Sequence, residues 1–266
     1  MSWTLFKVNI KASRTIWITM TCVFCFYLTV IISMFDPEGA DRLNEMLKTF
    51  PESMINAFGF GDMGTNLLTF ITSYIYGFLV LFIPMVVSIV INHKIIGSHI
   101  DKGSMAYLLA TPNSRIKIAI TQAVFSLASI TLLFTIATTF SILVAEKLFP
   151  GQLEIGKFIF INIYALLMYY TIGGIGFLAS CVSNESKTSL GLGIGIPVAF
   201  LVFQMLGNAG DKFSWIGNLS LYALFDPDKL ISGESFAYFG MVSFALIAIL
   251  LYGSGIAIFN KRDLSL

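Results

Sequence analysis

The chain has 266 residues, of which 56% are hydrophobic and only 12% are charged, and its mean hydropathy is +0.84. A typical soluble domain is about 25% charged, so too few charged side chains remain here to cover a soluble globule. The formal net charge of +1 provides no strongly basic or acidic surface, and we expect no nucleic-acid partner.

The first segment, residues 2–14, mixes apolar side chains with three basic ones. This mixture predicts a short amphipathic helix in the inner membrane interface, leading into the first span. The alternative is a basic flank of that span without a role of its own. The apolar members are Trp3, Leu5, Phe6, Val8 and Ile10, and the basic members are Lys7, Lys11 and Arg14.

Six apolar stretches follow, and each approaches the roughly 20 residues that a helix needs to cross a bilayer. None of them contains Asp, Glu, Lys, Arg or His, each of which costs roughly 2.5–3.5 kcal/mol at mid-membrane. The fold class is therefore predicted to be an all-α membrane protein with a single transmembrane domain over residues 1–266. The predicted spans are residues 15–34, 67–91, 118–143, 158–181, 190–206 and 237–259.

The loop charges predict the orientation. With the N-terminus inside, the inner segments hold ten of the 16 basic residues. This excess favours both termini in the cytoplasm. The acids agree, because only Asp101, Glu185 and Asp263 then lie inside.

Two outer loops have apolar patterns. In residues 35–66, apolar side chains recur near helical spacing, which predicts an amphipathic helix on the outer membrane surface, broken near Pro51. In residues 207–236, Trp215, Tyr222 and Phe225 suit the membrane headgroup region.

The chain offers little chemistry of its own. Its three cysteines, Cys22, Cys25 and Cys181, lie in apolar blocks, and the sequence places His93 and His99 in one cytoplasmic loop, so we expect no disulfide framework and no metal site. The strongly polar side chains of the spans are Gln122, Asn162 and Gln204. No catalytic residues are assigned, and we expect neither enzymatic activity nor a cofactor in this chain.

The loop between the second and third spans carries a helical pattern. Met105, Leu108 and Leu109 form an apolar stripe, Gly103-Ser104 supplies a turn and an N-cap before it, and Pro112 ends it. A short helix of this kind docks into a partner's groove. The alternative is a helix that lies back on the membrane face.

This loop resembles a known family. The run Asp101-Lys102-Gly103-Ser104, then Leu108-Leu109, then Pro112 to Arg115 is similar to the E-x-G-T…L-L…P-x-S-R signature of ABC transporter permeases of the type-2 exporter class. Residues 259–264 look like the F-x-R-R-D terminus of that family, and residues 173–195 fit its fourth-to-fifth span region. The chain departs from the signature at Asp101, Ser104 and Ala106, which soften the charge of the docking surface.

The resemblance implies a coupling helix between spans two and three, on which a separate ATPase acts. Two six-span permeases, identical or paralogous, would face one another above two ATPase subunits, which would bind ATP and Mg²⁺. Residues 97–115 form the predicted coupling segment. Its assigned contact and shaping residues are Gly97, Asp101, Lys102, Gly103, Ser104, Leu108, Leu109, Pro112 and Arg115.

Six glycines are assigned to close helix approach, with simple packing as the alternative. They are Gly173, Gly174, Gly176, Gly191, Gly193 and Gly195.

The resulting expectation is an ATP-driven exporter permease in a bacterial plasma membrane, with an amphipathic cargo such as a peptide, a lipid or a drug-like molecule. One alternative is a membrane immunity, sensor or assembly protein that binds a partner without moving cargo. Another is a secondary carrier or an intramembrane enzyme, which would need ionisable groups in its spans.

Overall fold

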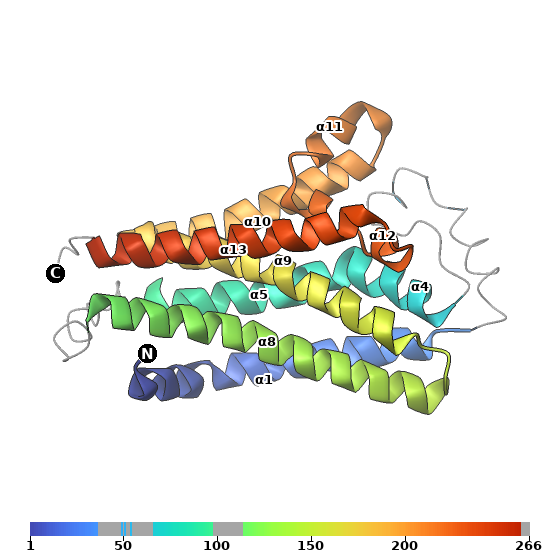
Figure 1. Cartoon of the computed structure of the whole chain (residues 1–266), viewed down its shortest axis with the longest axis horizontal. Coiled ribbons are helices and arrows are strands. Elements are labelled where there is room, and N and C mark those ends of the chain that lie inside the picture. The colour runs from blue at the N-terminus through green and yellow to red at the C-terminus, as the bar shows by residue number, and fades with distance from the viewer. Residues whose placement is uncertain (37–48, 50, 52–53, 55–65, 98–113, 262–266) are drawn as a thin grey trace.

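The computed structural model describes residues 1–36, 49, 51, 54, 66–97 and 114–261 of the chain. Within these ranges every regular element is a helix and no strand is present, which confirms the predicted all-α class. Figure 1 shows the long helices running side by side, with the N-terminus and the last described turns at the same end of the bundle.

Among the described residues, five helices are by length and composition apolar enough to cross a membrane. Four of the five contain a whole predicted span and extend beyond it by a few residues, as at Arg115 and Lys147 around the third predicted span. The first helix begins at Trp3, well before the first predicted span, and ends at Ser33, one residue short of its predicted end. The ends are polar because they leave the apolar region. The five are α1 (Trp3–Ser33), α8 (Arg115–Leu148), α9 (Ile155–Val182), α10 (Ser186–Asn208) and α13 (Ser235–Lys261).

The remaining predicted span, residues 67–91, is not one regular α-helix. Three consecutive pieces cover it and a fourth follows directly, and two of the four are π-helical. Pro84 lies inside it and lacks a backbone donor, and local irregularities of this kind are how helices accommodate proline. The predicted count of six spans is thus not confirmed, since no single piece is long enough. The pieces are α4 (Leu67–Ile71), η1 (Thr72–Leu79), α5 (Val80–Asn92) and η2 (His93–Gly97).

The predicted N-terminal helix is not a separate element, because α1 continues from it without a break. Its first turns cross α8: the backbone N–H of Ser2 donates to the hydroxyl of Thr121 (2.8 Å), and the rings of Phe6 and Phe125 meet edge to face at 5.3 Å. Residues 2–9 cover about 10 Å along α1, but their partners in α8, residues 121–125, cover only about 6 Å. The two helices therefore cross steeply here.

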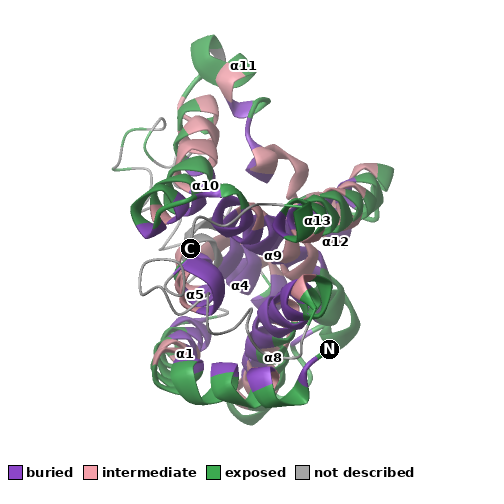
Figure 2. Ribbon diagram, turned by 90° about the vertical axis from the view of Figure 1, so that its left-hand side faces the viewer, coloured by how far each residue is buried: buried purple, intermediate pink, exposed green. Residues whose placement is uncertain are grey.

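α9 lies at the centre of the bundle. It packs against α13, α10, α5 and α8, and Figure 2 shows its buried ribbon between them. More than half of its most apolar stretch is buried, whereas the other four long helices bury a third or less of theirs. Their remaining apolar surface is left for lipid or for another subunit.

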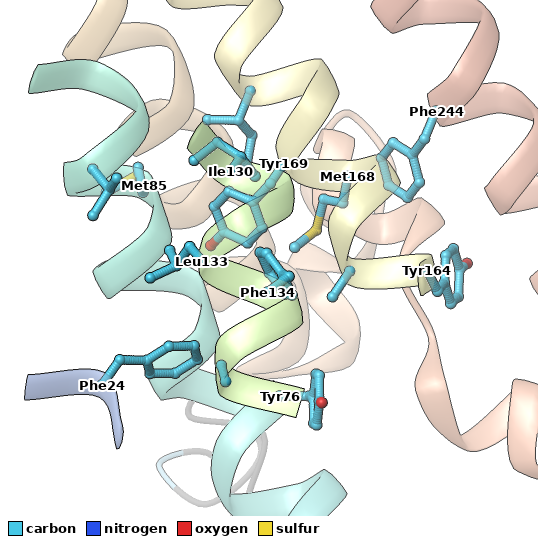
Figure 3. Close-up of a cluster of buried hydrophobic side chains, with 14 of the residues drawn as sticks. Phe24, Tyr76, Met85, Ile130, Leu133, Phe134, Tyr164, Met168, Tyr169 and Phe244 are labelled. Carbon is cyan, nitrogen blue, oxygen red and sulfur yellow. The ribbon is translucent and has the colours of Figure 1, made fainter. Parts of the chain in front are cut away.

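The core beside α9 is rich in aromatic side chains (Figure 3). Tyr169 of α9 faces Phe134 of α8 with ring centroids 5.6 Å apart, and Met85 of α5 and Phe24 of α1 approach the same cluster. Aromatic pairs of this kind contribute about 0.5–1.5 kcal/mol beyond their buried area. This cluster fixes how α1, α5 and α8 sit around α9.

Short helices connect α10 to α13. The backbone of Gly217, in the first part of this connection, lies close to that of Gly207 in α10, because a Cβ on Gly217 would lie 3.0 Å from the Cα of Gly207. The hydroxyl of Tyr164 in α9 donates to the carbonyl of Leu224 and anchors the later part of the connection. The connecting elements are η3 (Asp211–Phe213), α11 (Ser214–Gly217), η4 (Leu221–Leu224) and α12 (Pro227–Ile231). The amphipathic helix predicted in residues 35–66 falls largely outside the described residues.

Candidate functional site

Two of the nine predicted coupling residues lie in the described part of the chain. Gly97 is the last residue of η2, and Arg115 is the first residue of α8. The hydroxyl of Ser114 accepts from the backbone N–H of Lys117 (3.3 Å) and caps α8. The structure therefore shows where the predicted coupling segment is attached. The other seven, which lie outside the described residues, are Asp101, Lys102, Gly103, Ser104, Leu108, Leu109 and Pro112.

One buried amide ties η2 to two long helices. The side-chain nitrogen of Gln122 in α8 donates to the backbone carbonyl of Ile95 in η2 at 2.7 Å. The side-chain oxygen of Gln122 accepts from the amide of Asn9 in α1. Both amides are almost fully buried, where an unpaired polar group is costly. Gln122 thus joins α1, α8 and η2 through a single side chain.

A second contact joins η2 to α1. The ammonium group of Lys94 donates to the backbone carbonyl of Ala12 at 2.9 Å. This contact lies one turn beyond Asn9, at the end of the segment of α1 that crosses α8. A displacement of η2 would therefore act directly on the first turns of α1.

The third neighbour of η2 is α10. A ring nitrogen of His93 lies 3.4 Å from the hydroxyl of Ser186, at the start of α10. Gly97 lies close to the same ring: a Cβ there would come within 2.8 Å of Nδ1 of His93 and 3.3 Å of the hydroxyl of Ser189. The assignment of His93 to a loop was wrong, because the helix continues through it as a π-turn. We name η2 with Asn9, Ala12, Gln122, Ser186 and Ser189 the η2 collar.

Just above the collar, Asn92 joins α5 to the glycine-rich stretch of α9. Its side-chain nitrogen donates to the carbonyls of Ser88 (2.9 Å) and Gly173 (3.1 Å). A Cβ on Gly176 would lie 3.4 Å from the same nitrogen. Asn92 is not among the predicted site residues, because it comes one residue after the predicted second span. Its spacing of four residues from Ser88, which places both side chains on one helix face, is the sequence feature that could have indicated it.

The six predicted packing glycines differ in their surroundings. A Cβ on Gly173 would lie 2.8 Å from the hydroxyl of Tyr252, and one on Gly174 would lie 2.9 Å from Cβ of Leu251, both in α13. Gly193 faces Gly176, whose Cα would be 3.6 Å from a Cβ there.

By contrast, a Cβ on Gly191 or Gly195 would meet nothing within 4 Å. Both glycines are exposed, whereas Gly193 between them is buried. Gly193 of α10 therefore faces the bundle. Gly191 and Gly195, which are four residues apart, face away from the described part of the chain.

At the opposite end of the bundle lies a polar cleft of about 250 Å³ between η1, α10 and α12. Asp226 accepts from the backbone N–H of Lys229 (3.1 Å) and pairs with its ammonium group (3.1 Å). Desolvation raises the pKa of the Asp228 carboxyl, and the negative charge of Asp226 raises it further. The other lining residues are Thr72, Ser73, Tyr76, Gln204, Asn208, Tyr222, Phe225 and Pro227.

Across the described ranges, no group of three His, Cys, Asp or Glu side chains is placed to hold a metal ion. None of the three cysteines forms a disulfide, and of the three Cys181 is the buried one. The polar side chains of the η2 collar hold helices together, and the contact between the ring of His93 and the hydroxyl of Ser186 joins η2 to α10. The η2 collar is suited to transmit movement, because η2, which precedes the predicted coupling segment, is bonded to α1, α8 and α10.

Comparison with protein families gives one match, to the family described as ABC-2 family transporter protein, over residues 3–264. A comparison with curated proteins finds no match. The matched region includes every described helix and the predicted coupling segment. The chain therefore belongs to the ABC-2 family of transporter proteins and is a multi-pass membrane permease of an ABC transporter.

Proposed function

We propose that the chain is the membrane-spanning subunit of an ATP-driven exporter that moves an amphipathic cargo out of the cell. The observation that carries this proposal is the η2 collar. The predicted coupling segment leaves the bundle at Gly97, and the turn before it is bonded to α1, α8 and α10. A rigid-body shift of the segment would therefore tilt three helices at once.

The energy source is a separate ATPase, present in two copies. Permeases of this family normally work with an ATP-binding subunit, and this sequence has no G-x-x-x-x-G-K-[ST] phosphate loop. ATP and Mg²⁺ would bind to that partner. The common end at which η2, the start of α8, the N-terminus and the last described turn of α13 lie supports docking on the cytoplasmic side.

The second membrane subunit is another six-span permease, identical or paralogous. The proposed sixth span of this chain is the continuous helical run α4–η1–α5–η2. The outward face of α10 offers a contact for the second subunit, because two exposed glycines four residues apart allow close helix approach.

The cargo is an amphiphile because the predicted spans carry no charged side chain to replace the water shell of an ion. Vesicles from bacterial plasma membrane, the proposed location, should export a fluorescent amphiphilic peptide or lipid only with ATP and the partner present. Transport of the probe without either would contradict an ATP-driven exporter.

The docking of the ATPase is tested by Leu108→Asp and Leu109→Asp, which place a charge on the proposed contact. Each should abolish co-purification of the ATPase, while the exposed Leu219 on the opposite side gives a matched control, Leu219→Asp. Retained ATPase with both variants would overturn the coupling assignment. Retained docking without any transport would favour a partner-binding protein that moves no cargo.

A further inference from the structure

An apolar cleft of about 320 Å³ lies between the start of α1 and α8. Its walls are one face of each helix, with residues recurring every three or four positions. The exposed side chains of Ile10, Ile18 and Leu132 form its rim, so the cleft opens to the surroundings of the bundle. The other lining residues are Phe6, Ser13, Arg14, Trp17, Phe125, Ala128 and Ser129.

Packed side chains of α1 and α8 shape the cleft. The indole of Trp17 donates to the backbone carbonyl of Ser129 at 3.1 Å, which holds the ring as a wall between the two helices. The small side chains of Ser13, Ala128 and Ser129 leave the space that larger residues would fill. The rings of Phe6 and Phe125 close one end of the cleft.

One polar group in the lining has no partner. The hydroxyl of Ser13 is buried, with the residue only 2% exposed, and it forms no hydrogen bond among the described residues. A buried hydroxyl without an acceptor is unfavourable, so a ligand oxygen at this depth would satisfy it. The neighbouring Arg14 is exposed at the rim and has no ion-pair partner in the ranges that the structure describes.

The charge around the cleft has one sign. The first four turns of α1 carry three basic residues, Lys7, Lys11 and Arg14. The first acidic residue of the sequence is Asp36, which lies beyond the C-terminal end of α1. An anionic group on the ligand would therefore find cations, and no carboxylate of the described residues lines the cleft. The inner membrane leaflet supplies such anions as phospholipid head groups.

The length of the cleft matches one leaflet. Its lining covers a rise of about 10 Å along α8, from Phe125 to Leu132, and of about 18 Å along α1, from Phe6 to Ile18. Half of a typical hydrocarbon core, about 15 Å, lies between these two lengths. We propose that this cleft binds one anionic phospholipid of the inner leaflet, with an acyl chain between Trp17 and Ala128 and the phosphate at Arg14 and Ser13.

Native mass spectrometry of the full-length chain, extracted with its co-purifying subunits, tests the head-group contact. Titration with phosphatidylglycerol should give about fivefold tighter binding of one lipid than titration with phosphatidylcholine, the factor expected for one basic residue near an anion. Arg14→Gln should remove this preference. Lys11→Gln, which removes a cation that does not line the cleft, should keep it.

A second pair of variants tests the acyl-chain site. Ala128→Phe fills the cleft and should remove the retained lipid, whereas Val124→Phe, on the exposed face of α8 outside the cleft, should not. The proposal is overturned if the wild-type protein shows no preference, or if Arg14→Gln and Lys11→Gln lower it equally. Equal lipid retention in the two phenylalanine variants also overturns it. None of these outcomes depends on transport or on the ATPase.

Discussion

Gln122 is the residue that links the predicted coupling segment to the membrane helices most directly. Its side-chain nitrogen donates to the carbonyl of Ile95, and its side-chain oxygen accepts from the amide of Asn9. The sequence identified Gln122 as one of three strongly polar side chains in the spans, but it gave no partner. The partners come from elements 27 and 113 positions away, which no local pattern encodes.

Gln122→Leu should therefore weaken both stability and coupling. The variant leaves the carbonyl of Ile95 and the amide of Asn9 buried without a partner, which costs about 1–3 kcal/mol for each unsatisfied group. We expect a lower midpoint of thermal unfolding, and a larger loss of transport than of ATP hydrolysis in the same vesicles.

The matched control is Gln204→Leu. The amide of Gln204 in α10 bonds to the exposed Asn208 (3.2 Å), so its loss should change neither stability nor coupling by much. If Gln122→Leu behaves like Gln204→Leu, the amide is not a mechanical link.

At the scale of the helices, the sequence predicted five of the elements closely, since uninterrupted apolar blocks of about 20 residues permit little else in a membrane. It could not predict the π-turns in residues 67–97. A π-turn changes the hydrogen-bond register over a few residues while the composition stays apolar, and the same residues in sequence are compatible with a regular α-helix.

The interface between α9 and α13 gives a prediction at this scale. Gly174→Leu should destabilise the bundle by about 1–3 kcal/mol, because the new side chain overpacks against the stiff Cβ of Leu251. Thermal unfolding of the purified protein measures the effect.

Gly253→Leu on α13 is the control, since a Cβ there meets nothing within 4 Å. Leucine has the better helix propensity, so this variant should be neutral or slightly stabilising. Equal destabilisation by both substitutions would show that α9 and α13 do not pack through Gly174.

For the whole molecule, the outward face of α10 decides how the chain would assemble. A single subunit leaves Gly191 and Gly195 open, although the same helix packs Gly193 against α9. Helices in lipid associate through small residues that permit close approach, and this face is where we expect the second permease.

Gly195→Phe should lower the fraction of paired permeases in detergent or nanodiscs, as measured by mass photometry, while leaving the unfolding midpoint nearly unchanged. Gly253→Phe places the same side chain on the open face of α13 and should leave pairing intact. Loss of pairing in both variants, or in neither, would rule out α10 as the specific contact.

The sequence by itself determined that this is a membrane protein, that it is all-helical, and where most of its helices begin and end. These follow from composition and from the length of apolar blocks, because a backbone in lipid must satisfy its own hydrogen bonds. The motif at residues 101–115 also indicated the family, which the match over residues 3–264 confirms.

Only the tertiary structure decided which faces of these helices meet. Most of the spans are apolar on all sides, so their periodicity does not distinguish a face that packs on α9 from one that meets lipid. The inward Gly193, the outward Gly195, the bond from Gln122 to Ile95 and the helical position of His93 all depend on how the helices are rotated and crossed. Packing and buried hydrogen bonds between distant segments fix these rotations, and the hydropathy of the sequence does not indicate them.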